Sequence, residues 1–223
     1  MIKAVIFDLD DTLISEYCYV LSGYRKVSDV IAKKYFLEKE EVFEKLISLF
    51  RIDKKEVFNR LLEIMNIDYD KEDILGLVKV YREHIPDIVF FDDVIPVVKS
   101  LKNMGVKTGI ISDGYQITQR NKLLSLDAKK YFDYIILTDE WGKEFWKPSP
   151  KAFEEMKKMC NCRYSEMIYV GDNPTKDFYI SKIIPINTIR IIRANGIYQF
   201  ENYLEEIREK WRINSLHELL KLM

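Results

Sequence analysis

The chain has few of the residues that build disulfide frameworks or zinc sites. Its 223 residues include three cysteines and two histidines. Cys18, Cys160 and Cys162 are too few and too irregularly spaced for a disulfide framework, and no second Cys or His pair completes a four-ligand metal site. With only His84 and His217, zinc or triad chemistry based on histidine is not expected. A reducing cytoplasm is therefore the expected compartment.

Long apolar runs and an excess of basic residues are also missing. No stretch approaches the roughly 18 uncharged apolar residues of a membrane span. An aspartate at position 8 comes too early for a signal peptide. The formal net charge of -1 gives no global basic field, so we expect neither a nucleic acid nor a membrane as a partner. The sequence leaves the oligomeric state open.

What the chain does contain is a series of short apolar runs rich in β-branched residues. Longer charged segments separate these runs, which lie at 4–7, 108–111, 134–137, 167–170 and 188–192. The runs lack the alternation of apolar and polar residues found in half-exposed strands, as is typical of parallel strands buried on both faces by helices. The sequence therefore predicts an α/β fold with a doubly wound parallel sheet and a Rossmann-like core.

Between residues 15 and 90 the pattern changes to apolar stripes at helical spacing, without β-rich runs. We interpret this region as an all-helical insert of about four helices. Residues 1–14 and 91–223 then form the α/β core domain, and residues 15–90 form a second, helical domain. The charged and amphipathic segment 200–223 is expected to be a packed C-terminal helix followed by a short one.

A set of polar residues follows the predicted strands at their carboxyl ends, where an open parallel sheet forms its binding site. Carboxylates crowded after a buried strand repel one another and lose hydration, which is unfavourable unless a cation or a reaction needs them. The alternative interpretation is that the strand runs out into a solvated acidic loop. The joint pattern favours a phosphoryl-transfer site. In chain order the set is Asp8, Asp10 and Thr12, then Ser112-Asp113-Gly114, Lys147-Pro148 and Gly171-Asp172-Asn173, with Asp177 beyond.

The residue types in this set suit a metal ion and a phosphate group. Asp8, Asp172 and Asp177 offer the oxygen ligands that one hard cation such as Mg²⁺ prefers. The hydroxyl of Ser112 and the backbone N–H groups after it are suited to hold phosphate oxygens. Lys147 supplies a positive charge that offsets the carboxylates and an incoming phosphate dianion.

On these motifs the chain resembles the haloacid dehalogenase-like hydrolases, in the phosphatase branch with a helical cap inserted after the first strand. The family pattern Asp-x-Asp-x-Thr appears as Asp8-Leu9-Asp10-Asp11-Thr12. Ser112 and Lys147 match the second and third motifs, and the run from Gly171 to Asp177 matches the acidic fourth. The motifs occur in the expected order and spacing, so the resemblance covers nearly the whole chain.

The resemblance implies a phosphatase that hydrolyses a small phosphorylated metabolite, such as a sugar, polyol or nucleotide phosphate, in two steps. Asp8 would attack phosphorus and form an aspartyl-phosphate. Asp10 would protonate the leaving alcohol and then deprotonate the hydrolytic water. The residues that would bind the substrate phosphate are Ser112, Asp113 and Lys147.

The resemblance also implies a Mg²⁺ ion held by the side chains of Asp8 and Asp172 and by the backbone carbonyl of Asp10. Asp177 would support the metal from outside its ligand shell or hold Lys147. Asp11, in contrast, is expected to be an exposed loop residue without a catalytic role.

The helical insert, as a cap, would cover the strand edge as a lid and supply substrate contacts. Tyr17, Tyr19, Tyr24 and Arg25 are candidates for these contacts, but aromatic residues at helical spacing are more often core. Three alternatives stay open: a phosphomutase on the same fold, a dehalogenase or phosphonate hydrolase, and a non-catalytic binding or regulatory protein. The intact motif set argues against the last.

Overall fold

The computed structural model describes residues 1–223 and contains one six-stranded sheet, in which all neighbouring strands are parallel. The chain leaves the central strand β1 and builds the sheet outward to both sides, so the predicted doubly wound α/β fold is confirmed. The strands, in the order in which they lie in the sheet, are β3 (Tyr134–Leu137), β2 (Lys107–Ser112), β1 (Ala4–Phe7), β4 (Met167–Gly171), β5 (Asn187–Ile191) and β6 (Trp211–Ile213).

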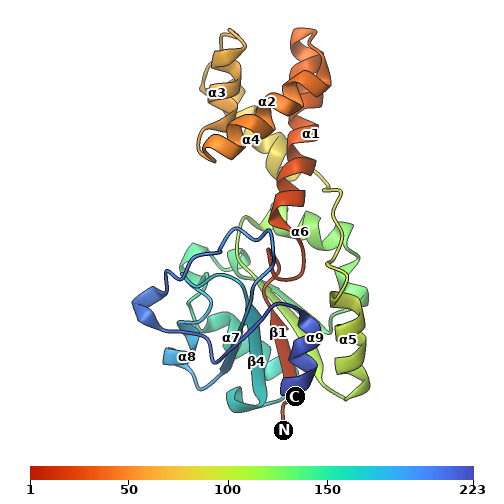
Figure 1. The fold of residues 1–223 in the computed structure, drawn as a ribbon, viewed down its shortest axis with the longest axis vertical. Helices are drawn as coiled ribbons and strands as arrows, with labels where there is room; N and C mark the ends of the chain where they lie inside the picture. The colour runs from red at the N-terminus through yellow and green to blue at the C-terminus, as the bar shows by residue number, and fades with distance from the viewer. The chain divides into compact units, whose positions relative to one another are not determined.

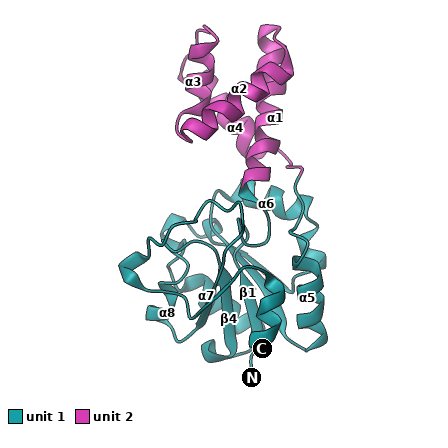
Figure 2. Ribbon diagram, in the orientation of Figure 1, with its two compact units in different colours: residues 1–16, 88–223 teal, residues 17–87 magenta.

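Two units divide the chain (Figure 2). Residues 1–16 and 88–223 form the first unit, here called the core unit, which holds the whole sheet. Residues 17–87 form the second, here called the helical unit. The sequence analysis places the ends of the insert at residues 15 and 90.

Burial on both faces of the sheet explains the unbroken apolar runs. All four residues of β1 are fully buried, and successive side chains of a strand point to opposite faces. Ile6 belongs to an apolar cluster with Met156 of α7 (Lys151–Cys160). The ring of Phe7 lies 6.0 Å from that of Phe132 in an edge-on arrangement. Each face of β1 therefore meets apolar side chains, and no position on the strand favours a polar residue.

The helices of the core unit pack against this sheet and against each other. Helix α5 contacts β2 and α9, α6 contacts β3, and α7 contacts both β2 and β3 (Figure 1). Besides α7, they are α5 (Val94–Asn103), α6 (Gln116–Ser125), α8 (Ile180–Ile183) and α9 (Leu216–Leu219). Short 3-10 helices lie at Ala128–Lys130, Thr138–Glu140, Lys143–Phe145, Tyr164–Glu166, Leu204–Glu206 and Leu220–Leu222.

Four helices account for most of the helical unit, in line with the apolar stripes of the sequence. They are α1 (Glu16–Tyr35), α2 (Lys39–Ile52), α3 (Val57–Ile64) and α4 (Lys71–Glu83). Their buried faces form one apolar cluster, which includes Val27, Leu46 and Leu61. No helix of the structure is both long enough and apolar enough to cross a membrane.

The aromatic residues near the start of α1 belong largely to the core of the helical unit. Tyr19 and Tyr24 are buried, and the ring of Tyr24 lies 5.8 Å from that of Phe50. The guanidinium of Arg25 stands over the ring of Phe43, at 4.1 Å from the ring centre. For Tyr19 and Tyr24 these contacts agree with the interpretation as core residues rather than as substrate contacts.

Of the two helices predicted over 200–223, the first is wrong, whereas the short second one is present as α9. This segment contains a 3-10 turn, the edge strand β6 and the short helix α9. Glu205 and Glu206 both have positive φ angles, which a continuous α-helix does not allow. Trp211 and Ile213 lie two residues apart on β6, which pairs with β5. The strand is only three residues long, too short for its alternation to outweigh the helical spacing of the apolar residues before it.

Candidate active site

The predicted site residues lie at the carboxyl ends of the central strands. Asp8 directly follows β1, Ser112 ends β2, and Asp172 directly follows β4. These three side chains and Lys147 are buried. Beside them lies a cavity of about 180 Å³ whose lining includes Asp8, Asp10, Asp113, Asp172 and Lys176. The strand order places β1 between β2 and β4, so loops that are far apart in the sequence meet at one cavity.

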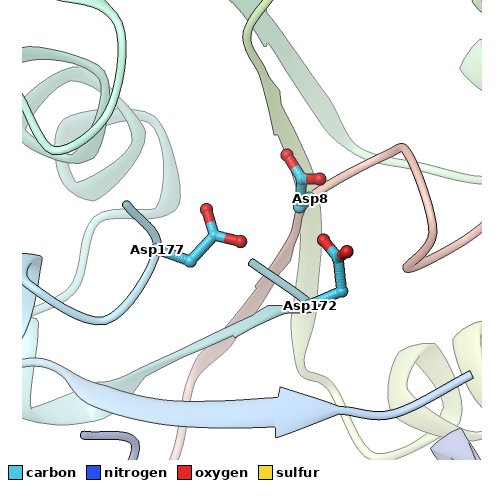
Figure 3. Close-up of side chains that lie close together, drawn as sticks. All are labelled: Asp8, Asp172 and Asp177. Carbon is cyan, nitrogen blue, oxygen red and sulfur yellow. The ribbon is translucent and has the colours of Figure 1, made fainter. Parts of the chain in front are cut away.

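Three carboxylates converge next to this cavity (Figure 3). One oxygen from each of Asp8, Asp172 and Asp177 lies within 4.8 Å of the others. Burial raises the pKa of Asp8 to about 6, against the opposing charge of Lys147. Burial and the charges of Asp177 and Asp8 hold the pKa of Asp172 well above its ordinary value. Carboxyl groups in this state favour a neutralising cation, and three oxygen ligands suit a hard divalent ion.

Glycine at the end of β4 makes this convergence possible. A Cβ atom built on Gly171 would overlap the carboxylate of Asp177. The same carboxylate accepts a hydrogen bond from the backbone N–H of Asn173, at 3.0 Å. The loop after β4 thus folds back on its own strand end, and this brings Asp177 next to Asp172.

Lys147 is the positive group inside the carboxylate cluster. Its Nζ contacts Asp8 and lies 3.0 Å from Oδ1 of Asp177 and 2.7 Å from Oη of Tyr169. Burial lowers the pKa of this lysine, but the charges of Asp177 and Asp8 outweigh burial and hold it well above its ordinary value. Lys147 therefore stays charged. Of the two roles expected for Asp177, the structure shows the contact with Lys147 directly.

The side chain of Asp10 faces a different set of partners. Its Oδ1 lies 2.7 Å from Nζ of Lys122, and its Oδ2 accepts a hydrogen bond from Nε2 of Gln119 at 3.0 Å. Burial raises the pKa of Asp10, but the charge of Lys122 prevails and holds it below its ordinary value. Because this carboxylate is held by Lys122 and Gln119, only the backbone carbonyl of Asp10 remains as the expected metal ligand.

The expectation that Asp11 is an exposed loop residue is wrong. Its side chain is buried and accepts hydrogen bonds from the backbone N–H groups of Glu16 at 3.0 Å and of Ile197 at 2.7 Å. It also has a φ angle of 49°, which Asp tolerates better than most residues. Asp11 ties the loop after β1 to the segment after β5. No pattern within the motif distinguishes such a buried acceptor from a solvated carboxylate.

Ser112 is the last residue of β2, and Asp113 follows the strand directly. The Asp113 carboxylate accepts hydrogen bonds from Oγ1 of Thr138 at 2.8 Å and from the backbone N–H of Lys147 at 3.2 Å. It also pairs with Nζ of Lys176 at 3.0 Å. An anionic side chain committed to these donors does not attract a phosphate. Contact between Asp113 and a phosphate group is therefore expected to involve its backbone N–H.

Several site residues are absent from the sequence prediction. Lys176 lies inside the fourth motif, between Asp172 and Asp177, so its position in the sequence could have identified it. Tyr169 is on β4 and reads as an ordinary apolar strand residue, yet its hydroxyl contacts Lys147 and donates to Asp177 at 3.0 Å. The partners of Asp10, Lys122 and Gln119, are more than 100 residues away along the chain. No local pattern joins them to Asp10.

A family model described as haloacid dehalogenase-like hydrolase matches residues 5–191. The chain belongs to this family. The match spans all four motifs and the helical unit between the first and second. It confirms the family resemblance drawn from the motifs and the expectation of an enzyme of this superfamily; the assignment to the branch with a helical cap stays a prediction.

Individual relatives agree with this placement. A protein of Methanocaldococcus jannaschii named glyceraldehyde 3-phosphate phosphatase is 28% identical to the chain, with 100% of this chain and 97% of the relative covered. A pyrophosphatase PpaX of Halalkalibacterium halodurans is 24% identical with the same coverage. The crystal structure of a HAD phosphatase from Thermococcus onnurineus matches with a TM-score of 0.63 at 25% identity, covering 99% of this chain and 97% of that one.

Proposed function

We propose that the protein is a Mg²⁺-dependent phosphatase that hydrolyses a small phosphorylated metabolite through an aspartyl-phosphate intermediate. The observation that carries the proposal is the position of Asp8. It lies at the end of the central strand, buried next to Asp172 and in contact with Lys147. A carboxylate nucleophile that lines a cavity, beside a fixed positive charge, is suited to attack a phosphate dianion.

In the first step a carboxylate oxygen of Asp8 forms a bond to phosphorus, and the bond between phosphorus and the alcohol oxygen breaks. Lys147 offsets the negative charge that otherwise repels the incoming phosphate. The hydroxyl of Ser112 and the backbone N–H groups that follow it bind the phosphate oxygens. Water then attacks the aspartyl-phosphate, and this step restores Asp8 and releases inorganic phosphate.

The donor set beside Asp8 fits Mg²⁺. Asp8 and Asp172 offer carboxylate oxygens, and the backbone carbonyl of Asp10 would be the third ligand that the family resemblance implies. Mg²⁺ binding typically uses one or two carboxylates, with water and phosphate in the other positions. A bound ion would offset the repulsion between the carboxylates and the phosphate and would withdraw charge from phosphorus.

Asp10 is the proposed general acid and base. Its carboxyl group lines the same cavity as Asp8 and lies two residues beyond it in the sequence. Because Lys122 favours the ionised form of Asp10 in the free protein, Asp10 would take up a proton when the negatively charged substrate binds. In the first step it gives this proton to the leaving alcohol oxygen, and in the second, ionised again, it takes a proton from the attacking water. An alkoxide is a poor leaving group, so ester cleavage gains from this proton in a way that halide release does not. The dehalogenase alternative is therefore disfavoured.

For the substrate, the relatives give a starting point. The names of the relatives include glyceraldehyde 3-phosphate phosphatase and pyrophosphatase. We propose a small phosphorylated sugar or polyol, with triose phosphates as the first compounds to test. The helical unit is the proposed cap domain, which would supply contacts to the leaving group. A phosphomutase would use the same catalytic core, but it would return the phosphoryl group to the sugar at another position instead of transferring it to water.

The test is release of inorganic phosphate from a panel of phosphorylated trioses, hexoses, polyols and nucleotides and from pyrophosphate. We expect release with Mg²⁺ and loss of release after EDTA treatment, with recovery when Mg²⁺ is added back. Full activity with metal rigorously absent would contradict the proposed metal role. Conversion of a sugar phosphate to its isomer without net phosphate release would identify a mutase instead.

A further inference from the structure

A buried lysine outside the family motifs contacts the proposed general acid. Nζ of Lys122 lies 2.7 Å from Oδ1 of Asp10 and 2.7 Å from Oε2 of Glu16. The side chain of Lys122 is only 1% exposed. Burying an ammonium group is unfavourable unless charged partners compensate, so a residue type that prefers the surface requires these two carboxylates at this position.

A glutamine from the same helix holds the other oxygen of Asp10. Nε2 of Gln119 donates to Oδ2 of Asp10 at 3.0 Å and to the backbone carbonyl of Asp113 at 3.0 Å. Both neighbours are acceptors, so the amide nitrogen must face them, and this fixes the orientation of the amide group. Gln119 is 4% exposed. The amide thus links Asp10 to the main chain that follows Ser112.

Both donors come from α6, at positions 119 and 122, which lie on one face of the helix. Helix α6 starts shortly after β2, whose last residue is Ser112. One short segment therefore carries the loop expected to bind phosphate and the two side chains that hold Asp10. Their spacing fixes where the carboxyl group of Asp10 lies relative to that loop.

The contacts of Asp10 leave it able to react. Besides Lys122 and Gln119, the carboxyl group of Glu16 also hydrogen-bonds to Asp10. Two carboxylate oxygens offer about four acceptor positions, so these three contacts leave room for a proton or a water molecule. Asp10 also lines the cavity beside Asp8. Its carboxyl group is restricted in rotation while it remains open to the space where substrate would bind.

We propose that Lys122 and Gln119 are positioning residues, which hold the carboxyl group of Asp10 in the orientation required for proton transfer to the leaving oxygen. This inference rests on the proposed function, because it assigns Asp10 as the general acid. Proton transfer depends steeply on the distance and alignment of the acid. Loss of either contact lets the Asp10 side chain rotate while the nucleophile Asp8 keeps its own contacts.

The test compares the first chemical step for two substrates that differ in their need for a proton. Rapid-quench trapping measures formation of the phosphoenzyme from an alkyl phosphate and from p-nitrophenyl phosphate, whose leaving group needs little protonation. For Gln119→Leu and Lys122→Met we expect a loss of roughly 10- to 100-fold with the alkyl phosphate and less than about threefold with p-nitrophenyl phosphate. A merely structural role predicts equal losses for the two substrates.

Matched variants make the result decisive. Arg120→Met removes an exposed ion pair with Glu140 from the same helix, and it should leave both rates unchanged. Lys122→Met removes the positive charge between the carboxyl groups of Asp10 and Glu16, and their repulsion could prevent folding. If Lys122→Met does not fold, Gln119→Leu alone tests the positioning role.

Asp10→Ala is the reference variant for the acid role. If Asp10→Ala shows the difference between the two substrates and both Gln119→Leu and Lys122→Met lack it, the positioning inference is overturned and the acid role of Asp10 stands. If Asp10→Ala also shows equal losses, the proposed acid role itself fails.

Discussion

Asp8, the proposed nucleophile, is the residue whose replacement tests the proposed mechanism most directly. We expect Asp8→Asn to lower turnover by at least about 10³-fold, because an amide of nearly the same size is a poor nucleophile. The variant should fold, since Lys147 keeps its contact with Asp177 at 3.0 Å. In metal-free protein at neutral pH it should even melt higher than the wild type, because one of three crowded carboxylates becomes neutral.

The matched control for this change is Asp92→Asn, at an exposed position of the core unit. It should leave turnover and melting temperature unchanged. Turnover is measured as phosphate release, and folding is followed by thermal denaturation. Substantial phosphatase activity in Asp8→Asn would remove the aspartyl-phosphate from the mechanism.

Asp11 has a structural role in the loop after β1 and no proposed role in catalysis. Asp11→Ala removes two partly buried hydrogen bonds, from the N–H groups of Glu16 and Ile197, and places alanine at a positive φ angle. We expect a loss of about 1–3 kcal/mol in the free energy of unfolding. Asp11→Asn keeps an acceptor oxygen and tolerates the same φ angle, so it should lose less. Urea denaturation compares the three proteins, and an alanine variant as stable as the wild type would show that these hydrogen bonds contribute nothing.

At the scale of whole elements, the sequence predicted β1 to β5 because each contains a short run rich in β-branched or other apolar residues, most of them buried. The run at 4–7 coincides with β1, and the runs at 108–111 and 167–170 lie within β2 and β4. The predicted strands also located the site residues, because parallel strands end at one edge of the sheet and the motifs lie in the loops there. Strand β6 was missed because an edge strand of three residues has almost no pattern of its own. The contact between Lys122 and Asp10 was missed because only the fold brings α6 to the end of β1.

The C-terminal segment gives a test of the structure at this scale. Leu219 of α9 is fully buried, whereas Lys221 is exposed. Leu219→Ala should destabilise the core unit by about 2–5 kcal/mol, because a cavity remains where the side chain packed. Lys221→Ala should change stability by less than about 0.5 kcal/mol. Chemical denaturation measures both, and equal effects would mean that the end of the chain does not pack on the core unit.

At the scale of the whole molecule, the two units differ in what their sequences reveal. The core unit carries residues whose order and chemistry point to one site, so its function can be argued from the motifs. The helical unit carries an apolar core of the usual kind, in which Tyr19 and Tyr24 are buried. If the helical unit is the proposed cap, substrate choice would depend on a few of its polar positions, and no spacing rule distinguishes these from ordinary surface residues. The substrate therefore requires the panel of phosphate esters.

The response of the whole protein to pH and Mg²⁺ follows from the carboxylate cluster. In the metal-free protein the pKa of Asp8 is raised to about 6 and that of Asp172 is raised well above its ordinary value. A folded protein with raised carboxyl pKa values binds more protons than the unfolded chain, so its stability falls as pH rises through those values. Mg²⁺ competes with the same protons, so it should bind more weakly at low pH.

We therefore expect Mg²⁺ at millimolar concentration to raise the melting temperature of EDTA-treated protein more at about pH 8 than at about pH 5.5. Differential scanning fluorimetry measures the shift, and isothermal titration calorimetry in two buffers of different ionisation enthalpy detects the protons released. Asp172→Asn is the control, because it keeps the size of the side chain and removes a charged ligand, and the shift should largely disappear. A shift as large at the lower pH as at the higher one would mean that Mg²⁺ does not bind to the cluster of Asp8, Asp172 and Asp177.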